Sequence, residues 1–269
     1  GTQNLTKFDD NVLTHSIHDR TIFPGTGDID DPDFHVYNSP LERGAGDAEV
    51  LDEGTLFCGL IDRFMPDFIF IAAGADGLAE DPLSSLQYTI DGIRTIASEH
   101  PDVQFAIEYK AKEPRVRMLL ATATKTLLAI QETGVDNVGI VMDFGHSLLA
   151  NETPAEMVQL IHRHGKLVSA ELNDNWRGWD DDLPVGSVHL FETLEYMLAL
   201  REIGWSDPVL LDQFPFREDP VAAVSRSIET IQKLNAVCDR MDLAALRQAQ
   251  DAQDALAAQA VLWDAVLGK

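Results

Sequence analysis

Short apolar runs rich in Val, Ile and Phe recur along the chain, and turn-forming residues bound each of them. Runs of this length and composition are typical of buried parallel strands, whose side chains are apolar on both faces of the sheet. The pattern predicts seven strands, at residues 12–17, 34–38, 68–72, 104–109, 139–142, 167–172 and 209–211.

Longer amphipathic stretches lie between these runs and predict helices at residues 47–63, 85–99, 116–133, 154–164, 187–203 and 220–238. Strands that alternate with helices indicate βαβ units and a parallel sheet. The tail, residues 242–267, is rich in Ala, Gln and Leu and holds no proline, which favours a further helix. Its apolar positions fit either packing on its own domain or an arm that packs on a neighbouring subunit.

Composition narrows the classes of function. The 269 residues, 45% of them hydrophobic, suffice for one large domain or two smaller ones. A formal charge of −25 disfavours binding to nucleic acid and to anionic membranes. Two cysteines without neighbouring ligands argue against a disulfide scaffold or thiolate zinc site, and no apolar run has the length of a membrane span. We expect a cytoplasmic protein, with a processed or truncated start because the chain opens without Met.

Acidic residues follow four successive predicted strands in the second half of the chain. Glu108, Asp143, Glu171 and Asp212 each come directly after an apolar run. The carboxyl ends of neighbouring parallel strands meet in one crevice, so these side chains should lie close together. Clustered carboxylates repel one another unless they are protonated or bind a cation. The sequence therefore predicts a divalent metal site.

The chemistry of these ligands narrows the choice of ion. Oxygen ligands with at most one imidazole favour Mn²⁺ or Mg²⁺, with Co²⁺ and Zn²⁺ as alternatives. Asp180 and Asp182, in the loop after Glu171, fit a second ion together with His146, whereas the competing interpretation of this acidic loop is a helix cap or solvated charge. Three further histidines of this half have structural or exposed roles in our interpretation: His162, His164 and His189.

The segment Glu108-Tyr-Lys110-Ala-Lys-Glu113-Pro114-Arg115 resembles the Glu-x-Lys-x-x-Glu-Pro-Arg segment of the xylose isomerase-like sugar isomerases. Within this family, the short segments Asn-Asp-Asn-Trp and Trp-Asp-Asp-Asp most resemble those of the L-rhamnose isomerase-like branch. Glu171 departs from the family, whose members commonly have His or Asp there, so the resemblance leaves the metal preference open. The later motifs follow the family's order: Asp143 with His146, Glu171 with Asn173, Asp180 with Asp182, and then Asp212.

This resemblance implies that an aldose and its ketose are interconverted through an open-chain sugar at a divalent metal. In the hydride-shift version one ion acts as Lewis acid and a second activates water. Glu108 and Asp212 would be ligands at the reacting centre, Lys110 would polarise the sugar carbonyl, and Asn173 would contact the sugar. Related epimerases instead move a proton between two carboxylates, and this alternative stays open.

The first 89 residues resemble a different family. Ser-Ile-His-Asp-Arg from residue 16, Phe-Pro-Gly-Thr-Gly-Asp from residue 23, and Ala-Gly-Ala-Asp ending at Asp76 are similar to an internal segment of the histone deacetylase-like amidohydrolases. Asp76 would be a vestigial zinc ligand, because the family's other two ligands belong to a motif that precedes Gly1. His15, His18 and His35 are candidate replacements, although a packed core histidine is the favoured interpretation.

The two resemblances together predict an α/β fold of parallel βα units, with a TIM-barrel-like half barrel fused to an arginase/deacetylase-like segment near residues 88–90. The expected domains are a deacetylase-like segment at 1–89, a half barrel with the metal site at 90–241 and a C-terminal helix at 242–269. A metal-dependent sugar isomerase is the favoured function, ahead of an inactive chimeric or designed scaffold that retains the metal site and of a zinc deacetylase fragment. The expected partners are a small sugar and, through the C-terminal helix, a second copy of the chain.

Overall fold

The computed structural model describes residues 8–19, 29–42, 47–66, 68–71, 82–113 and 116–268. The chain divides into two compact units, Gly1–Asp67 and Phe68–Lys269. The domain boundaries after residues 89 and 241 rest on family resemblance, and compactness does not test them, so they stay predictions. Asp76 lies outside the described residues.

The described residues of the first unit form one pair of parallel strands and one long helix. His15 is part of its packing: Nε2 lies 2.9 Å from Ser39 Oγ, the Ser39 hydroxyl donates to Glu53, and the imidazole stacks on Phe57. His35 packs edge-on against a phenylalanine of the helix. These contacts give both histidines a structural role, whereas the side chain of His18 lies outside the described set. The elements are β1 (Thr14–Asp19), η1 (Pro32–Phe34), β2 (Val36–Leu41) and α2 (Asp47–Phe64).

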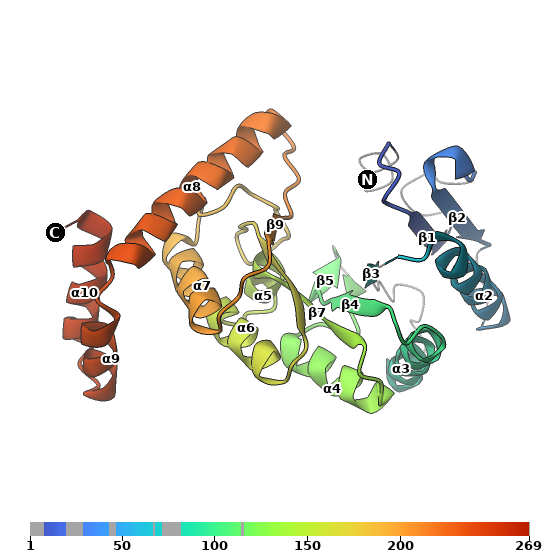
Figure 1. Ribbon diagram of the computed structural model, residues 1–269, viewed down its shortest axis with the longest axis horizontal. Helices are drawn as coiled ribbons and strands as arrows, with labels where there is room; N and C mark the ends of the chain where they lie inside the picture. Colours follow the sequence, from blue (N-terminus) through green and yellow to red (C-terminus); the bar gives the residue numbers. More distant parts are fainter. Residues whose placement is uncertain are drawn as a thin grey trace. The chain divides into compact units, whose positions relative to one another are not determined.

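The second unit is built on a five-stranded parallel sheet whose spatial order follows the chain (Figure 1). Every residue of its central strand is buried, as expected for a strand covered on both faces. Within the described residues no pairing joins the first strand to the last, and the parallel βα units that the sequence predicts are confirmed. The strands are β3 (Phe68–Ile71), β4 (Gln104–Glu108), β7 (Val138–Asp143), β8 (Leu167–Leu172) and β9 (Val209–Leu211).

The helices of this unit pack in chain order along the sheet, each against the next. The predicted junction at residues 88–90 lies inside the first of them, and Ile90 is 1% exposed, so the helix buries side chains at the join. None of the described helices combines the length and apolar character that crossing a membrane requires. The helices are α3 (Pro82–Glu99), α4 (Ala123–Thr133), α6 (Pro154–Arg163), α7 (Leu190–Glu202) and α8 (Pro220–Arg240).

Two predictions around the site were wrong. The helix predicted from residue 116 begins only at Ala123, where the hydroxyl of Thr122 caps it by accepting from Lys125 N. The residues before it instead form the short antiparallel pair β5 (Lys112–Glu113) and β6 (Val116–Arg117). The short helix α5 (Phe144–Leu149) was not predicted, because six residues carry too little periodicity to reveal it.

The tail forms two helices, α9 (Leu243–Asp251) and α10 (Ala255–Leu267), where the sequence predicts one. Gln253 between them has a left-handed backbone (φ 55°), and the Asp254 side chain caps α10 by accepting from a backbone N–H. Ala265 and its neighbours pack on α7 and α8 of the same chain. This is the intramolecular alternative of the two, and packing on a second copy stays a prediction.

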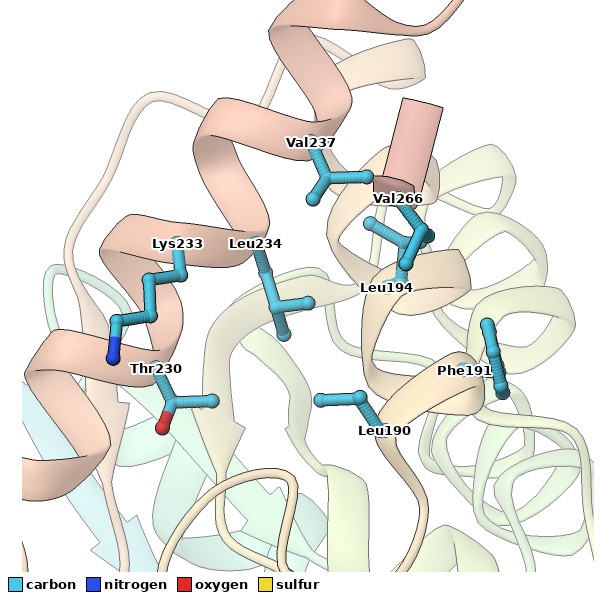
Figure 2. Close-up of a pocket in the computed structure, with 8 residues that line it drawn as sticks. All are labelled: Leu190, Phe191, Leu194, Thr230, Lys233, Leu234, Val237 and Val266. Carbon is cyan, nitrogen blue, oxygen red and sulfur yellow. The ribbon is translucent and has the colours of Figure 1, made fainter. Parts of the chain in front are cut away.

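An apolar pocket of ≈ 210 Å³ lies where α7, α8 and α10 meet (Figure 2). Lys233 is the one ionisable residue among those that line it, so the pocket lacks the acids and bases that catalysis needs. A catalytic site is therefore expected at the strand ends of the sheet. The lining residues are Leu190, Phe191, Leu194, Thr230, Lys233, Leu234, Val237 and Val266.

The close approach of β7 and β8 requires a glycine at position 139. A Cβ atom there would lie 2.6 Å from Lys166 O and press on Val168. We expect Gly139→Ala to destabilise the protein by about 1–3 kcal/mol, because overpacking forces backbone shifts. Gly92→Ala is the matched control, since nothing lies within 4 Å of its added Cβ, and this helix position should gain up to about 1 kcal/mol. Urea unfolding checks both, and an unchanged midpoint for Gly139→Ala would contradict the packing.

Candidate metal centre

Four carboxylates converge at the carboxyl ends of β4, β7, β8 and β9. Glu108 ends β4, Asp143 ends β7 directly opposite Glu171 of β8, and Asp212 follows β9. One oxygen from each of these four side chains lies within 4.8 Å of the others. The structure thus brings together the four residues that the sequence singles out as the metal shell.

Asp143 is the buried centre of this group and is fully enclosed. Its Oδ1 accepts from His146 N at 2.6 Å and so caps α5, while its Oδ2 accepts from the amide of Asn173 at 2.9 Å. Gly145 packs directly against Asn173, and an added Cβ there would collide with the Asn173 amide oxygen. Asn173 is itself 0% exposed, so its amide orients a carboxylate, and the sugar contact expected of it stays a prediction.

A row of ionisable groups borders the four carboxylates. Lys110 Nζ lies 2.7 Å from Asp180 Oδ2, and the same oxygen lies 3.1 Å from His146 Nε2. On its other side, His146 Nδ1 lies 3.0 Å from Glu108 Oε1. Lys110, Asp180, His146 and Glu108 therefore form a continuous chain of contacts that ends on one of the converging carboxylates.

Burial and mutual repulsion shift the pKa values of this cluster. Burial, together with the charges of Asp143 and Glu108, raises the pKa of Glu171 to about 9. The pKa values of Asp143 and Asp212 are raised as well, first by burial. Without a cation the Glu171 carboxyl therefore binds a proton at neutral pH, which is the behaviour expected of a site that accommodates a positive charge.

Asp180 and Asp182, the two acids of the loop after β8, differ in their partners: Asp180 is ion-paired and Asp182 is not. Burial would raise the pKa of Asp180, but hydrogen bonds and charge from His146 and Lys110 lower it to about 2. Burial raises the pKa of Asp182 to about 8, and Asp182 Oδ1 is a buried acceptor without a hydrogen-bond partner. Burial alone would lower the pKa of His146, yet the surrounding carboxylates hold it well above its usual value.

His146 also joins Glu108 and Asp212 in a second group of three that could hold an ion. Asp180 and Asp182 belong to neither such group within the described part of the chain. Asp180 is instead occupied by the Lys110 ammonium and the His146 imidazole. A second ion at Asp180 and Asp182 therefore remains a prediction.

Asp174 is a positioning residue that the sequence did not reveal. It is 0% exposed and accepts from the backbone N–H groups of Val188 and His189, at 2.7 and 2.9 Å, and from His189 Nδ1 at 2.8 Å. Backbone hydrogen bonds in both directions join it to Leu183. These bonds close the loop that carries Asp180 and Asp182, and His189 has the structural role that the sequence predicts.

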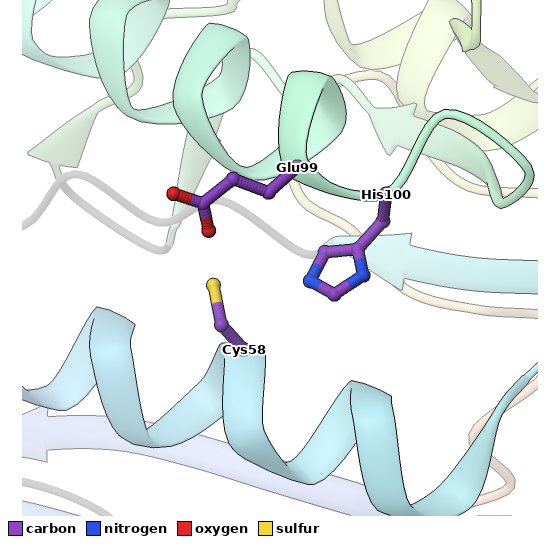
Figure 3. Close-up of side chains that lie close together, drawn as sticks. All are labelled: Cys58, Glu99 and His100. Carbon is purple, nitrogen blue, oxygen red and sulfur yellow. The ribbon is translucent and has the colours of Figure 1, made fainter.

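Figure 3 shows one more set of metal-binding residue types, Cys58, Glu99 and His100. Cys58 comes from α2 in the first unit, whereas Glu99 and His100 lie at the end of α3 in the second. We assign no site to these residues because they belong to different units.

Two family models match the chain. The model described as xylose isomerase-like TIM barrel matches residues 60–234, more than half of the sequence, and the histone deacetylase domain model matches residues 1–111. Both resemblances found in the sequence are thereby confirmed, and the matched ranges overlap at residues 60–111. The two matches are consistent with a chimera of the two families.

Curated relatives match the deacetylase-like part. A "Probable deacetylase" of Archaeoglobus fulgidus is 36% identical over 100 residues, which are 34% of this chain and 27% of that protein. "Histone deacetylase 14, chloroplastic" of Arabidopsis thaliana is 33% identical over 107 residues, 37% of this chain and 25% of that protein. The chain spans about a quarter of the length of these relatives.

Solved structures match the fold across the larger part of the chain. A D-tagatose 3-epimerase-like protein has a TM-score of 0.56 at 17% identity, covering 87% of this chain and 83% of that one. D-psicose 3-epimerase, solved in the presence of D-fructose, has a TM-score of 0.54 at 15% identity, with coverage of 75% and 78%. IOLI protein with a zinc atom has a TM-score of 0.53 at 17% identity, with coverage of 70% and 69%. At these identities the likeness shows the fold.

The raised pKa of Glu171 predicts how stability depends on pH. A carboxyl whose pKa is higher in the folded than in the unfolded state binds more protons when folded, so stability falls as pH rises between the two values. For Glu171 this window runs from the ordinary pKa of a glutamate, 4.5, to about 9. We expect the metal-free protein to lose stability between pH 5 and pH 8, and Glu171→Gln to reduce that loss.

The control is Glu132→Gln, which removes the same charge from an exposed position on α4 and should leave the slope unchanged. Urea unfolding in the presence of a chelator at several pH values measures the effect. A slope that Glu171→Gln and Glu132→Gln alter equally would show that general charge repulsion, and not this buried carboxyl, is the cause.

Proposed function

The chain belongs to the xylose isomerase-like TIM barrel family, and from this premise we propose that it interconverts an aldose and a ketose at a divalent metal site. The observation that carries the proposal is the convergence of four carboxylates from four neighbouring parallel strands. Structures of the same fold are named as sugar epimerases, one solved with D-fructose, and another was solved with zinc. A small sugar and a divalent ion are therefore the ligands we propose here.

The donor set fits a hard divalent cation. Glu108, Asp143, Glu171 and Asp212 offer oxygen only, and the His146 ring is the one nitrogen donor beside them. Mn²⁺ or Mg²⁺ is therefore the proposed ion, with Co²⁺ or Zn²⁺ as alternatives. The unpartnered, buried Oδ1 of Asp182 adds a further acceptor at the border of the site. When bound, the ion supplies Lewis acidity to the oxygens of an open-chain sugar.

Lys110 is the proposed electrophilic partner of the sugar carbonyl. Its ammonium is only part-exposed, and Asp180 Oδ2 at 2.7 Å holds it beside the carboxylates. A fixed cation at this point stabilises negative charge that develops on a sugar oxygen during isomerisation. Because Asp180 is held from its other side by His146, the ammonium is oriented before substrate arrives.

The contacts between Glu108, His146 and Asp180 provide a path for a proton. Glu108 is part-exposed and can accept a proton from a sugar hydroxyl, and the His146 ring, whose raised pKa keeps it protonated, lies 3.0 Å away at Nδ1 as a proton donor. The other ring nitrogen of His146 faces Asp180 at 3.1 Å. In a hydride shift this path adjusts hydroxyl protons only, whereas in an epimerase it would serve the carbon-bound proton.

Two alternatives remain. The chain is an inactive chimeric or designed scaffold if it binds the metal without turning over sugars. A zinc deacetylase fragment is less well supported, because the matched relatives are covered over only about a quarter of their length and Asp76 lies outside the described residues.

Metal binding is the first test of the proposal. We expect calorimetric titration of metal-free protein with Mn²⁺ to show binding that Glu108→Gln and Asp212→Asn each weaken at least tenfold, because each variant removes a charged ligand. Glu132→Gln, an exposed site on α4, should bind Mn²⁺ as the parent does. Binding that is equally strong in all four proteins would place the ion elsewhere and remove the proposed site.

The fate of a deuterium label distinguishes the two reactions. With Mn²⁺ present, L-rhamnose and other aldoses deuterated at C2 should yield ketose that retains deuterium at C1, as a hydride shift requires. Loss of the label to water would favour proton transfer through Glu108 and His146. Absence of any ketose from a protein that binds Mn²⁺ would support the inactive scaffold.

A further inference from the structure

Four aromatic side chains stand exposed on the two loops that also carry acids of the metal centre. Trp176 and Trp179 follow β8, with exposed fractions of 68% and 49%, and Phe214 and Phe216 follow β9, with 51% and 71%. We call these four residues the aromatic border. We propose that the aromatic border is a stacking subsite for a second sugar ring, so that the substrate class is a reducing disaccharide. This inference rests on the proposed isomerase function.

The chain places the aromatic border next to the reacting centre. Trp179 directly precedes Asp180, whose Oδ2 contacts Lys110 Nζ at 2.7 Å. Phe214 is two residues beyond Asp212, and its backbone N–H donates to Asp182 O at 3.2 Å. The loop after β8 and the loop after β9 are thus joined to each other where their acids meet.

Exposed aromatic rings have a cost that a ligand can offset. A large apolar side chain in water gains free energy when another apolar surface covers it, and exposed apolar patches mark binding sites more often than chance. A pyranose ring with equatorial hydroxyls presents a face of C–H groups, whose partial positive charge suits the negative face of an aromatic ring. A saccharide is therefore an occupant that matches both the rings and the adjacent polar centre.

The loop that carries the two tryptophans is already ordered by hydrogen bonds. Trp176 N donates to Asp181 Oδ2 at 2.9 Å, and Arg177 N donates to Asn175 Oδ1 at 2.8 Å. Lys112 Nζ donates to Gly178 O at 2.6 Å, directly before Trp179. A platform fixed in this way loses little entropy when a ligand binds, which makes stacking effective.

Phe214 and Phe216 form a second pair of exposed rings, on the loop after β9. Phe214 and Phe216 lie with their ring centroids 4.8 Å apart and tilted by 55°. The guanidinium of Arg177, between the two tryptophans in sequence, is part-exposed beside Glu192 and offers donors to ring hydroxyls. Aromatic faces with a few fixed polar groups are the usual composition of small-molecule sites.

The two-ring substrate leaves the reaction balanced without a further reactant. The reducing unit opens, the hydrogen on C2 moves to C1, the proton of the C2 hydroxyl moves to the C1 oxygen, and the terminal aldose becomes a ketose of the same formula. The glycosidic bond and the second ring are unchanged. The acids and Lys110 act on the open unit, while the aromatic border holds the closed ring.

Two of the four tryptophans, Trp176 and Trp179, are in the aromatic border, whereas Trp205 and Trp263 are outside it. Tryptophan fluorescence can therefore report on a ligand at the border. The full chain is titrated with cellobiose, maltose and lactose, and separately with glucose, by calorimetry and by tryptophan fluorescence. The titrations are run with a chelator and again with Mn²⁺. We expect at least one disaccharide to bind tenfold more tightly than glucose under both conditions and to change the fluorescence.

Variants separate stacking from folding. Trp179→Ala and Phe216→Ala should each weaken disaccharide binding about tenfold, whereas Trp179→Phe, which keeps a ring, should stay within about threefold of the parent. Trp263→Phe, which changes a ring that pairs with Phe191 between α10 and α7, should bind sugar and change fluorescence as the parent does. If the enzyme is active, Trp179→Ala should raise KM for the disaccharide tenfold with kcat within twofold.

The possible results distinguish a failure of the aromatic subsite from a failure of the proposed isomerase function. No disaccharide binding in the parent, equal binding of glucose, or full binding by Trp179→Ala and Phe216→Ala would each overturn the subsite. None of these results depends on metal, because the chelator arm has none. Absence of Mn²⁺ binding would instead overturn the isomerase proposal while the chelator arm still decides whether the aromatic border binds sugar.

Discussion

The stability of the second unit depends on what balances four carboxylates that lie close together at one end of a parallel sheet. Glu108, Asp143, Glu171 and Asp212 occupy neighbouring strand ends because the strands are parallel and in chain order. Mutual repulsion and burial raise the pKa of Glu171 to about 9, so the site resists full ionisation by itself. A bound dication or retained protons must complete it, and this requirement governs both the stability and the chemistry of the unit.

The surroundings of the carboxylates fix them and neutralise them only in part. Asp143 accepts from His146 N and from the Asn173 amide, which are neutral donors that orient its two oxygens. The His146 ring, whose pKa the carboxylates hold well above its usual value, is a cation 3.0 Å from Glu108, whereas the Lys110 ammonium pairs with Asp180 outside the group of four. Asp174 in turn closes the loop that carries Asp180 through bonds to Val188 and His189. One imidazolium balances only part of the charge of four carboxylates, and the remainder is left for a ligand or for retained protons.

Sequence patterns predicted what depends on local composition. β8 and β9 have the predicted bounds, and the four acids lie at the carboxyl ends of their strands or directly after them. The features that were missed depend on contacts between distant residues. The short helix α5 exists because Asp143 caps it and Asn173 packs on Gly145, and Asp174 acquires its role from partners fourteen and fifteen residues away. The break between α9 and α10 requires a left-handed backbone at Gln253, and no proline or glycine marks this position in the sequence.

The join between the two family resemblances is compatible with the metal centre for a topological reason. The predicted junction lies within α3, before β4, and each of the four carboxylates belongs to β4 or to a later strand. Among the described residues, the contacts that orient these acids also come from positions after the junction, including His146 and Asn173. The proposed ion site therefore takes its four carboxylates from one continuous segment of one sheet. Substrate binding does not follow from the carboxylates alone, because a sugar extends beyond the strand ends. On this unit the aromatic loops after β8 and β9 are the surface that the rest of the sugar would contact first.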